Sequence, residues 1–303
     1  MRLPERIPNM MRTVSTLLAL AVAGHAVLAQ QRGVKVFISV DMEGIAGVVS
    51  GNQTGASGPD YSFGRRMMTA EANAAVAAAF DAGATEVVVN DSHGSMINLQ
   101  PDQMDRRATL ITGSPKPWGM MQGIDSTYAA VIFIGYHAQA STADGVLDHT
   151  YTGQLKAVRL NGREVGEYGL NAALAGHYGV PVVLISGDRA VTDQAKGFIP
   201  GVEPVAVKEG IGRTAARTLH PEEARERIAG GVRAALARRA QIVPVRLSRP
   251  VALEVELTNT AQADAAMMVP GMQRLAPRTV KYEAPDMAVA YRVSRLIAAL
   301  AMP

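Results

Sequence analysis

Short apolar runs alternate with longer Ala-rich segments along most of the chain, from residue 34 onward. The runs are rich in β-branched residues and almost without polar positions, which is typical of strands buried on both faces of a parallel sheet. Between the first two runs, residues 69–82 place apolar side chains at helical spacing, and Gly83 is a residue type that commonly ends a helix. The pattern predicts a βαβ unit followed by further strands, at residues 34–40, 86–89, 129–134 and 182–185.

Two further helices are predicted at residues 165–178 and 221–239, the second beginning at Pro221 with acidic residues behind it. After Pro244 the pattern changes, and strands are predicted at 251–257 and 280–283 before a last helix at 287–300. We therefore predict an α/β fold: a mainly parallel sheet with flanking helices, forming a Rossmann-like core, at residues 33–197, plus a smaller C-terminal α/β lobe at residues 198–303.

The first 29 residues are typical of a targeting segment. Three arginines precede an apolar stretch at 14–22 that is too short to span a bilayer, and small residues around Ala29 suit cleavage. We expect residues 1–29 to be a signal peptide and the protein to be exported, periplasmic or secreted, without stable membrane insertion after cleavage. The alternative is an uncleaved membrane anchor.

Composition narrows the possible functions. Of the 303 residues, 48% are hydrophobic and 19% charged, as in ordinary globular proteins. The net charge of +3 falls to +1 once the three Arg and one Glu of residues 1–29 are removed, so nucleic-acid binding is not expected. Without Cys the chain has no thiol nucleophile and no thiolate metal site, so a metal would have to bind His, Asp or Glu.

Residues that can bind metal follow three of the predicted strands directly. Asp41 and Glu43 follow the first strand, His93 the second and His137 the third. The carboxyl ends of parallel strands lie along one edge of a sheet, so these side chains can converge there. Asp41 and Glu43 also point to the same side of an extended backbone, where two carboxylates repel unless a cation or a shared proton neutralises them.

The mixture of imidazole and carboxylate suits zinc, manganese or iron better than magnesium or calcium. Taken singly, each signal has an ordinary explanation, since a lone DxE is often an exposed turn and a lone His is often structural. Their coincidence at successive strand ends favours a metal site. The spacings HExxH and GxSxG and that of a phosphate-binding loop do not occur in the chain.

Four ordered motifs, SVDMEGIAG, VNDSHGSM, GYHAQAST and VGEYGLNA, together with MVPGM at 268–272, resemble the D-aminopeptidases of the M55 metallopeptidase family. The similarity runs in order over essentially the whole chain after residue 33. In that family two zinc ions share a carboxylate. The resemblance implies Asp41 as the bridging ligand, with Glu43 and His93 binding one Zn²⁺ and His137 and Glu167 binding the other.

The resemblance also implies His149, in GVLDHTYTG, as the catalytic residue, although the loop before it is one residue longer here than in the family. Asn171, one turn after Glu167, is expected to orient that carboxylate. His177 and His220 are expected to be structural or capping residues, and His25 belongs to the signal peptide.

The implied activity is a dinuclear zinc aminopeptidase that hydrolyses short peptides with N-terminal D-residues, of the D-Ala-D-Ala type, through a metal-bound water. The family also implies a ring-shaped homo-oligomer, a decamer, that admits only short peptides. Two alternatives remain open from the residues alone: an exported protein that binds a peptide or metal without catalysis, and a two-metal hydrolase that acts on L-peptides or another amide.

Overall fold

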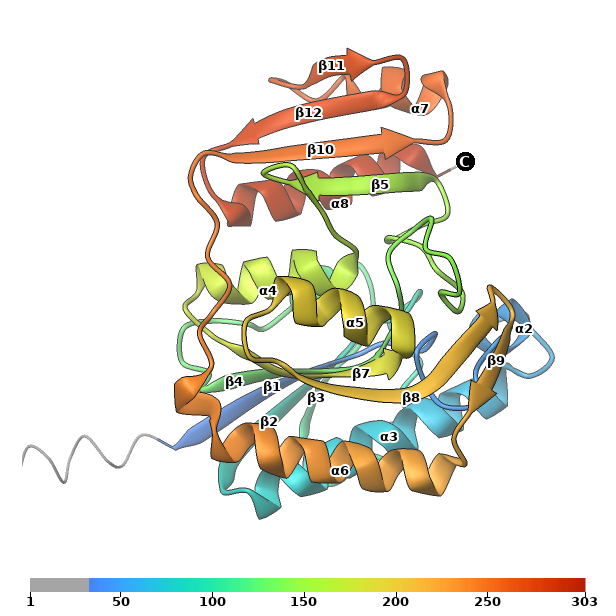
Figure 1. The fold of residues 1–303 in the computed structure, drawn as a ribbon, viewed down its shortest axis with the longest axis vertical. Helices are drawn as coiled ribbons and strands as arrows, with labels where there is room; N and C mark the ends of the chain where they lie inside the picture. Colours follow the sequence, from blue (N-terminus) through green and yellow to red (C-terminus); the bar gives the residue numbers. More distant parts are fainter. Residues whose placement is uncertain (1–32, 303) are drawn as a thin grey trace, which may run out of the picture. The chain divides into compact units, whose positions relative to one another are not determined.

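The computed structural model describes residues 33–302, and the predicted signal peptide at 1–29 lies outside the described residues. Seven strands form the first sheet, in the order β3-β2-β1-β4-β7-β8-β9 (Figure 1). The pairs β2–β3, β1–β4, β4–β7 and β7–β8 are parallel, and β8 and β9 are antiparallel. The strands are β1 (Val34–Val40), β2 (Ala84–Asp91), β3 (Thr109–Ile111), β4 (Ala130–Tyr136), β7 (Val182–Asp188), β8 (Glu203–Gly212) and β9 (Ala215–Thr218).

Helices cover both faces of this sheet (Figure 1). Helices α3 (Tyr61–Asp81) and α6 (Pro221–Ala237) pack together on one face, and α4 (Glu167–His177) and α5 (Arg189–Phe198) pack on the other. The central strands β1 and β4 are therefore buried almost throughout, which explains their nearly unbroken apolar sequences.

The second sheet is antiparallel, in the order β11-β12-β10-β5-β6. Helix α8 (Met287–Ala301) packs against β10 and β12 and also contacts α4, so it lies between the second sheet and the first (Figure 1). The strands of this sheet are β5 (Leu155–Leu160), β6 (Arg163–Glu164), β10 (Val251–Leu257), β11 (Gln273–Ala276) and β12 (Thr279–Ala284). The remaining helical segments are α2 (Gly51–Thr54), η1 (Gly119–Met121), η2 (Arg239–Gln241) and α7 (Thr260–Ala266).

The predicted α/β class, with a mainly parallel sheet and flanking helices, is confirmed. Each predicted strand and helix coincides with an observed one, although α3 begins eight residues earlier than expected. Sheet membership does not follow the expected division at residue 198. Strands β8 and β9, beyond that boundary, extend the parallel sheet, and β5 and β6, before it, pair with β10 in the second.

No helix within residues 33–302 is long and apolar enough to cross a membrane.

Candidate metal centre

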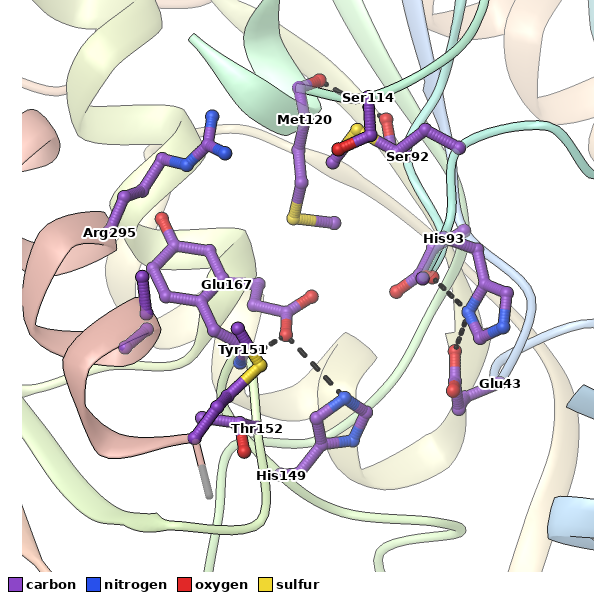
Figure 2. A pocket seen from close by; sticks show the side chains of 16 residues that line it. Glu43, Ser92, His93, Ser114, Met120, His149, Tyr151, Thr152, Glu167 and Arg295 are labelled. Atoms are coloured by element: carbon purple, nitrogen blue, oxygen red, sulfur yellow. Dashed lines mark hydrogen bonds and ion pairs between the residues drawn. The ribbon is translucent and has the colours of Figure 1, made fainter. Parts of the chain in front are cut away.

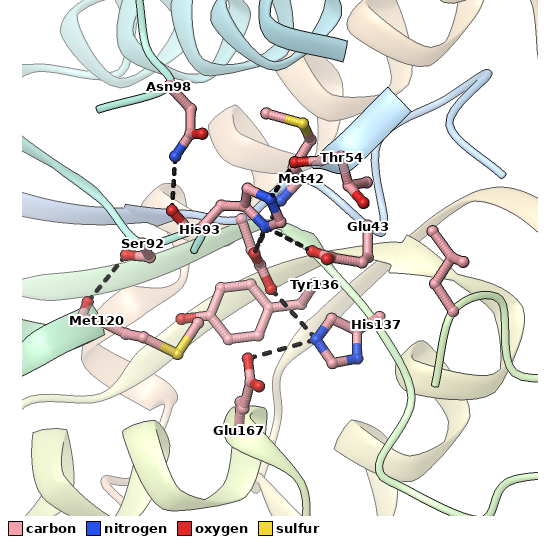
Figure 3. A network of polar contacts seen from close by, with 12 residues as sticks. Met42, Glu43, Thr54, Ser92, His93, Asn98, Met120, Tyr136, His137 and Glu167 are labelled. Carbon is pink, nitrogen blue, oxygen red and sulfur yellow. Dashed lines mark hydrogen bonds and ion pairs between the residues drawn. The ribbon is translucent and has the colours of Figure 1, made fainter. Parts of the chain in front are cut away.

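The six residues expected at the site lie together at the carboxyl edge of the first sheet. Figure 3 shows four of them, Glu43, His93, His137 and Glu167. Asp41 and Glu43 follow β1, His93 follows β2, and His137 follows β4, while Glu167 is the first residue of α4. His149 comes from the loop between β4 and β5. The carboxylates and His137 are buried, and His93 and His149 are partly buried.

The backbone at the end of β1 lies close to the backbone at the end of β4. Gly135 has a φ of +71°, and a Cβ there would lie 2.3 Å from the carbonyl oxygen of Asp41. A Cβ on Gly44 would lie 1.9 Å from the carbonyl oxygen of Tyr136. Any side chain at either position would separate the strand ends that carry Asp41 and His137.

On one side of the centre, His93 faces two carboxylates. Its Nδ1 lies 2.9 Å from Glu43 Oε2 and 3.3 Å from Asp41 Oδ1. The loop that carries His93 is fixed by Asp91, whose carboxylate accepts hydrogen bonds from the backbone N–H groups of Asn98 and Leu99.

On the other side, His137 Nε2 lies 3.4 Å from Asp41 Oδ2 and 3.4 Å from Glu167 Oε2. The His149 ring stacks on His137 with centroids 4.1 Å apart, and its Nε2 lies 3.7 Å from Glu167 Oε1. Asp41 thus reaches both halves of the centre through its two oxygens.

Each of the three histidines binds a backbone carbonyl with its outer nitrogen. His93 Nε2 contacts Thr54 O, His137 Nδ1 contacts Ala138 O, and His149 Nδ1 contacts Leu147 O, all at 2.9 Å. A carbonyl oxygen only accepts, so the outer nitrogen carries hydrogen in every case. The inner nitrogen is left to hold a second proton or a metal ion, which is the usual arrangement of metal-binding histidines.

The charges of the centre demand a cation. Burial raises the pKa of Asp41, and the Glu43 carboxylate raises it further, to about 7. Burial opposes the charged form of His137, but Glu167 and Asp41 outweigh it and raise its pKa to about 10. His93 behaves in the same way, since Glu43 and Asp41 hold its pKa well above the ordinary value. The inner nitrogens of His93 and His137 therefore hold protons in the absence of a metal.

The donor atoms fit metal ions. Asp41 Oδ2 and His137 Nε2 are buried and have no hydrogen-bond partner within residues 33–302. Two groups of side chains, Asp41 with Glu43 and His93, and Glu167 with His137 and His149, each offer ligand atoms that lie within 4.8 Å of one another. Nitrogen and carboxylate oxygen without thiolate suit Zn²⁺.

Comparison with known proteins places this geometry in a family. The family model Peptidase M55, D-aminopeptidase, matches residues 34–296. The chain belongs to the M55 family of D-aminopeptidases. It is therefore an aminopeptidase of the hydrolase class, as the sequence motifs indicated.

A curated M55 protein and a solved M55 structure are similar to the chain over nearly their whole length. The D-aminopeptidase of Bacillus subtilis (strain 168) is 40% identical over 270 residues, which span 88% of this chain and 98% of the relative. The solved structure described as the Zn-dependent D-aminopeptidase DppA from Bacillus subtilis, a self-compartmentalizing protease, has a TM-score of 0.87 and 38% identity, with the same shares covered.

The M55 centre opens into a cavity of about 480 Å³ (Figure 2). Asp41, Glu43, His93 and Glu167 line one part of it together with His149. Residues from α8, among them Arg295, form the opposite wall. A cavity of this size accommodates a small peptide.

Several residues that hold the proposed ligands in place were not predicted from the sequence. The Tyr151 N–H donates to Glu167 Oε1 at 2.6 Å, and Thr54 acts through its backbone carbonyl, so neither contact has a side-chain signature. Lys208, on β8, is buried and donates to the carbonyls of Glu43, Ile45 and Val48. A single Lys within the apolar run PVAV-K is a signal that could have indicated a buried structural cation.

One expected contact is wrong. Asn171 does not orient Glu167, because its amide donates to Tyr136 Oη at 2.8 Å and its oxygen accepts from Tyr291 at 2.7 Å. Helix α4 turns its buried face here toward β4 and α8 rather than toward the centre. His220 is the capping residue it was expected to be, since its ring accepts from the Glu222 N–H at the start of α6.

Proposed function

We propose that this M55 peptidase is a dinuclear zinc aminopeptidase that releases N-terminal D-residues from short peptides of the D-Ala-D-Ala type. The observation that carries the proposal is the arrangement of the three histidines, each with its outer N–H on a carbonyl and its inner nitrogen facing buried carboxylates. The Zn dependence and the D-aminopeptidase activity described for the relatives support the metal and the substrate.

The proposed ligands divide into two sets that share Asp41. Glu43 and His93 would hold one Zn²⁺ and His137 and Glu167 the other, with one Asp41 oxygen on each side. Zinc bound there would polarise a peptide carbonyl and lower the pKa of water. Tyr151 supports this arrangement, because its N–H fixes one oxygen of Glu167.

His149 is the residue we assign to proton transfer. Burial and the neighbouring His137 lower the pKa of His149, so its ring is neutral at neutral pH. Its Nδ1–H is fixed on Leu147 O, so Nε2 is the atom that would take up a proton from the attacking water and give it to the leaving amine. The N-terminal amine of the peptide would lie in the same part of the cavity, because the bond to be cleaved must reach the metal centre lined by Asp41, Glu43 and Glu167.

A substrate panel tests the proposal. Protein expressed without residues 1–29 and loaded with zinc should release D-alanine from D-Ala-D-Ala, and EDTA should abolish the release. Metal analysis should find two Zn²⁺ per chain. Activity that survives complete metal removal, or a preference for L-Ala-L-Ala, would contradict the proposed mechanism or the proposed substrate respectively.

We also propose that the protein is exported and acts as a closed homo-oligomer, a decamer by its resemblance to the family. The family match begins at residue 34, after the signal-like segment, and DppA is described as self-compartmentalizing. Ile211 and Met268 are large apolar side chains that are 73% and 81% exposed, as contact residues between subunits would be in an isolated chain. Light scattering of the purified protein and N-terminal sequencing after export test the two statements.

A further inference from the structure

Arg295 is a cation in the cavity of the candidate metal centre that has no acidic partner among the described residues. It lies on α8 and lines the cavity, whereas the carboxylates of Glu43 and Glu167 line other parts of the same cavity (Figure 2). No ion pair joins Arg295 to any carboxylate within residues 33–302. The ion pairs that other arginines of that segment form lie mostly at the surface.

The guanidinium of Arg295 is held in place by one hydrogen bond, and its other N–H donors are unused within the described residues. Its Nη1 donates to the carbonyl oxygen of Lys116 at 2.8 Å, the one hydrogen bond that it makes within the described residues. Arginine has five N–H donors, so four remain for a ligand. Gly119 makes room for this position, because a Cβ there would lie 2.1 Å from Nη1.

The cavity therefore has two chemically different ends, with Arg295 at one and the candidate metal centre at the other. Figure 2 shows Arg295 on the side opposite His93 and Glu43, with Glu167 and the Tyr151 ring between them. Ala298 and Ala299, from the same helix, line the cavity beside Arg295, and their short side chains leave its wall open. A carboxylate on a molecule in the cavity would be attracted to the Arg295 end.

We propose that Arg295 binds the C-terminal carboxylate of the substrate and so makes this enzyme selective for short peptides with a free C-terminus. The guanidinium presents parallel N–H groups that match the two oxygens of a carboxylate. This inference rests on the proposed function, since the N-terminal end of the same peptide must reach the metal centre for cleavage. Arg295 is thus a specificity-determining residue rather than part of the metal centre.

Kinetics with matched substrates test the assignment. D-Ala-D-Ala carries the carboxylate, D-Ala-D-Ala amide lacks it, and D-alaninamide reports on the metal centre alone. In the wild-type enzyme we expect KM for the amide-capped dipeptide to exceed that for D-Ala-D-Ala at least tenfold. Arg295→Gln should raise KM for D-Ala-D-Ala by about 10- to 100-fold, with kcat nearly unchanged and D-alaninamide hydrolysis within about twofold.

Two further variants separate binding from a structural role. Arg295→Lys keeps the charge and should recover part of the loss, because Lys binds carboxylates as a point charge. Arg292→Gln removes an arginine one turn earlier on α8, which lies over the Trp118 ring and does not line the cavity. It should leave all three substrates unaffected.

Binding to EDTA-treated protein, measured by calorimetry, gives a readout without turnover. The wild type should bind D-Ala-D-Ala more tightly than its amide, and Arg295→Gln should bind the two equally. An equal loss for D-Ala-D-Ala and D-alaninamide in Arg295→Gln, or a wild type that does not distinguish acid from amide in binding, would overturn the assignment. If the zinc enzyme releases D-alanine from no substrate, the proposed function fails, while the calorimetric comparison still decides the role of Arg295.

Discussion

His137 and His149 stack on each other, yet their surroundings move their pKa values in opposite directions. His137 is close to two carboxylates, which raise its pKa to about 10 against the effect of burial. For His149, burial and the positive charge of His137 lower the pKa. One ring is therefore suited to binding a cation and the other to accepting a proton. This difference separates two residues of the same type within one cluster.

The separation is testable by substitution. His137→Ala should lose bound zinc, because it removes an inner nitrogen that faces two carboxylates. His149→Ala should keep both zinc ions and lose kcat by about 10²- to 10⁴-fold, the range for removal of a general acid–base group. Zinc per chain from elemental analysis and kcat for D-Ala-D-Ala are the two measurements.

His220→Ala provides the matched control, since His220 caps α6 and takes no part in the centre. It should leave zinc content and kcat unchanged. A His149→Ala protein that has lost one zinc ion would make His149 a ligand and remove it from proton transfer.

At the scale of elements, the segment that follows β1 is held by two buried side chains from other parts of the chain. Glu71, on α3, accepts the Ala46 N–H at 2.9 Å, and Lys208, on β8, donates to three carbonyls of residues 43–48. The position of Glu43 therefore depends on the packing of α3 and β8 against β1. Loss of either contact would loosen a proposed ligand without touching the metal.

Glu71 gives the protein a pH-dependent stability. Burial raises its pKa from 4.5 to about 7 in the folded chain. Between these values the unfolded chain ionises while the folded chain stays protonated, so the free energy of unfolding falls as pH rises. The loss is complete above pH 7 and amounts to about 3 kcal/mol. Glu71→Gln has no carboxyl group to ionise, so its free energy of unfolding does not fall in this way. Its free energy of unfolding relative to wild type should therefore rise by about 3 kcal/mol between pH 4.5 and pH 8.

Urea unfolding of both proteins at the two pH values measures the effect, and effects of pH on the remaining groups cancel in the difference. Glu226→Gln, an exposed position on α6, controls for removal of one charge. A difference between Glu71→Gln and wild type that stays constant with pH would show that Glu71 is ionised in the folded protein throughout.

At the scale of the whole molecule, the proposed metal ions join segments that are far apart in the sequence. Asp41, His93 and His137 follow three different strands and Glu167 begins α4, and the buried carboxylates among the proposed ligands repel one another without a cation. Zinc should therefore stabilise the complete fold. With free zinc at about 100 times its Kd, the gain is about 2.7 kcal/mol for each bound ion, which raises Tm by roughly 5 °C per ion in a chain of this size.

Differential scanning calorimetry of the zinc-loaded and EDTA-treated protein measures this shift. Re-addition of zinc should restore Tm, whereas Mg²⁺ should not, because imidazole nitrogen is a poor ligand for magnesium. An unchanged Tm after complete zinc removal would show that zinc bound at the centre does not stabilise the fold.

The local sequence determined the main elements of the parallel sheet and where the chemistry begins. A strand buried on both faces must be apolar, so the strands before Asp41, His93 and His137 could be predicted from their apolar sequences. A parallel sheet places the carboxyl ends of these strands at one edge. The motifs then indicated Glu167 and His149 through the family. Short or polar strands such as β3, β6 and β9 were not predicted, because their residues carry little hydrophobic pattern and are selected by pairing with neighbours.

Only the tertiary structure decided what surrounds these residues. The carbonyls that hold the three histidines belong to backbone at Thr54, Ala138 and Leu147, which has no side-chain pattern to read. Arg295 reaches the cavity because α8, more than a hundred residues after the last proposed ligand, packs between the second sheet and α4. Such contacts depend on how distant segments pack, and the periodicity of each segment alone carries no information about its partners.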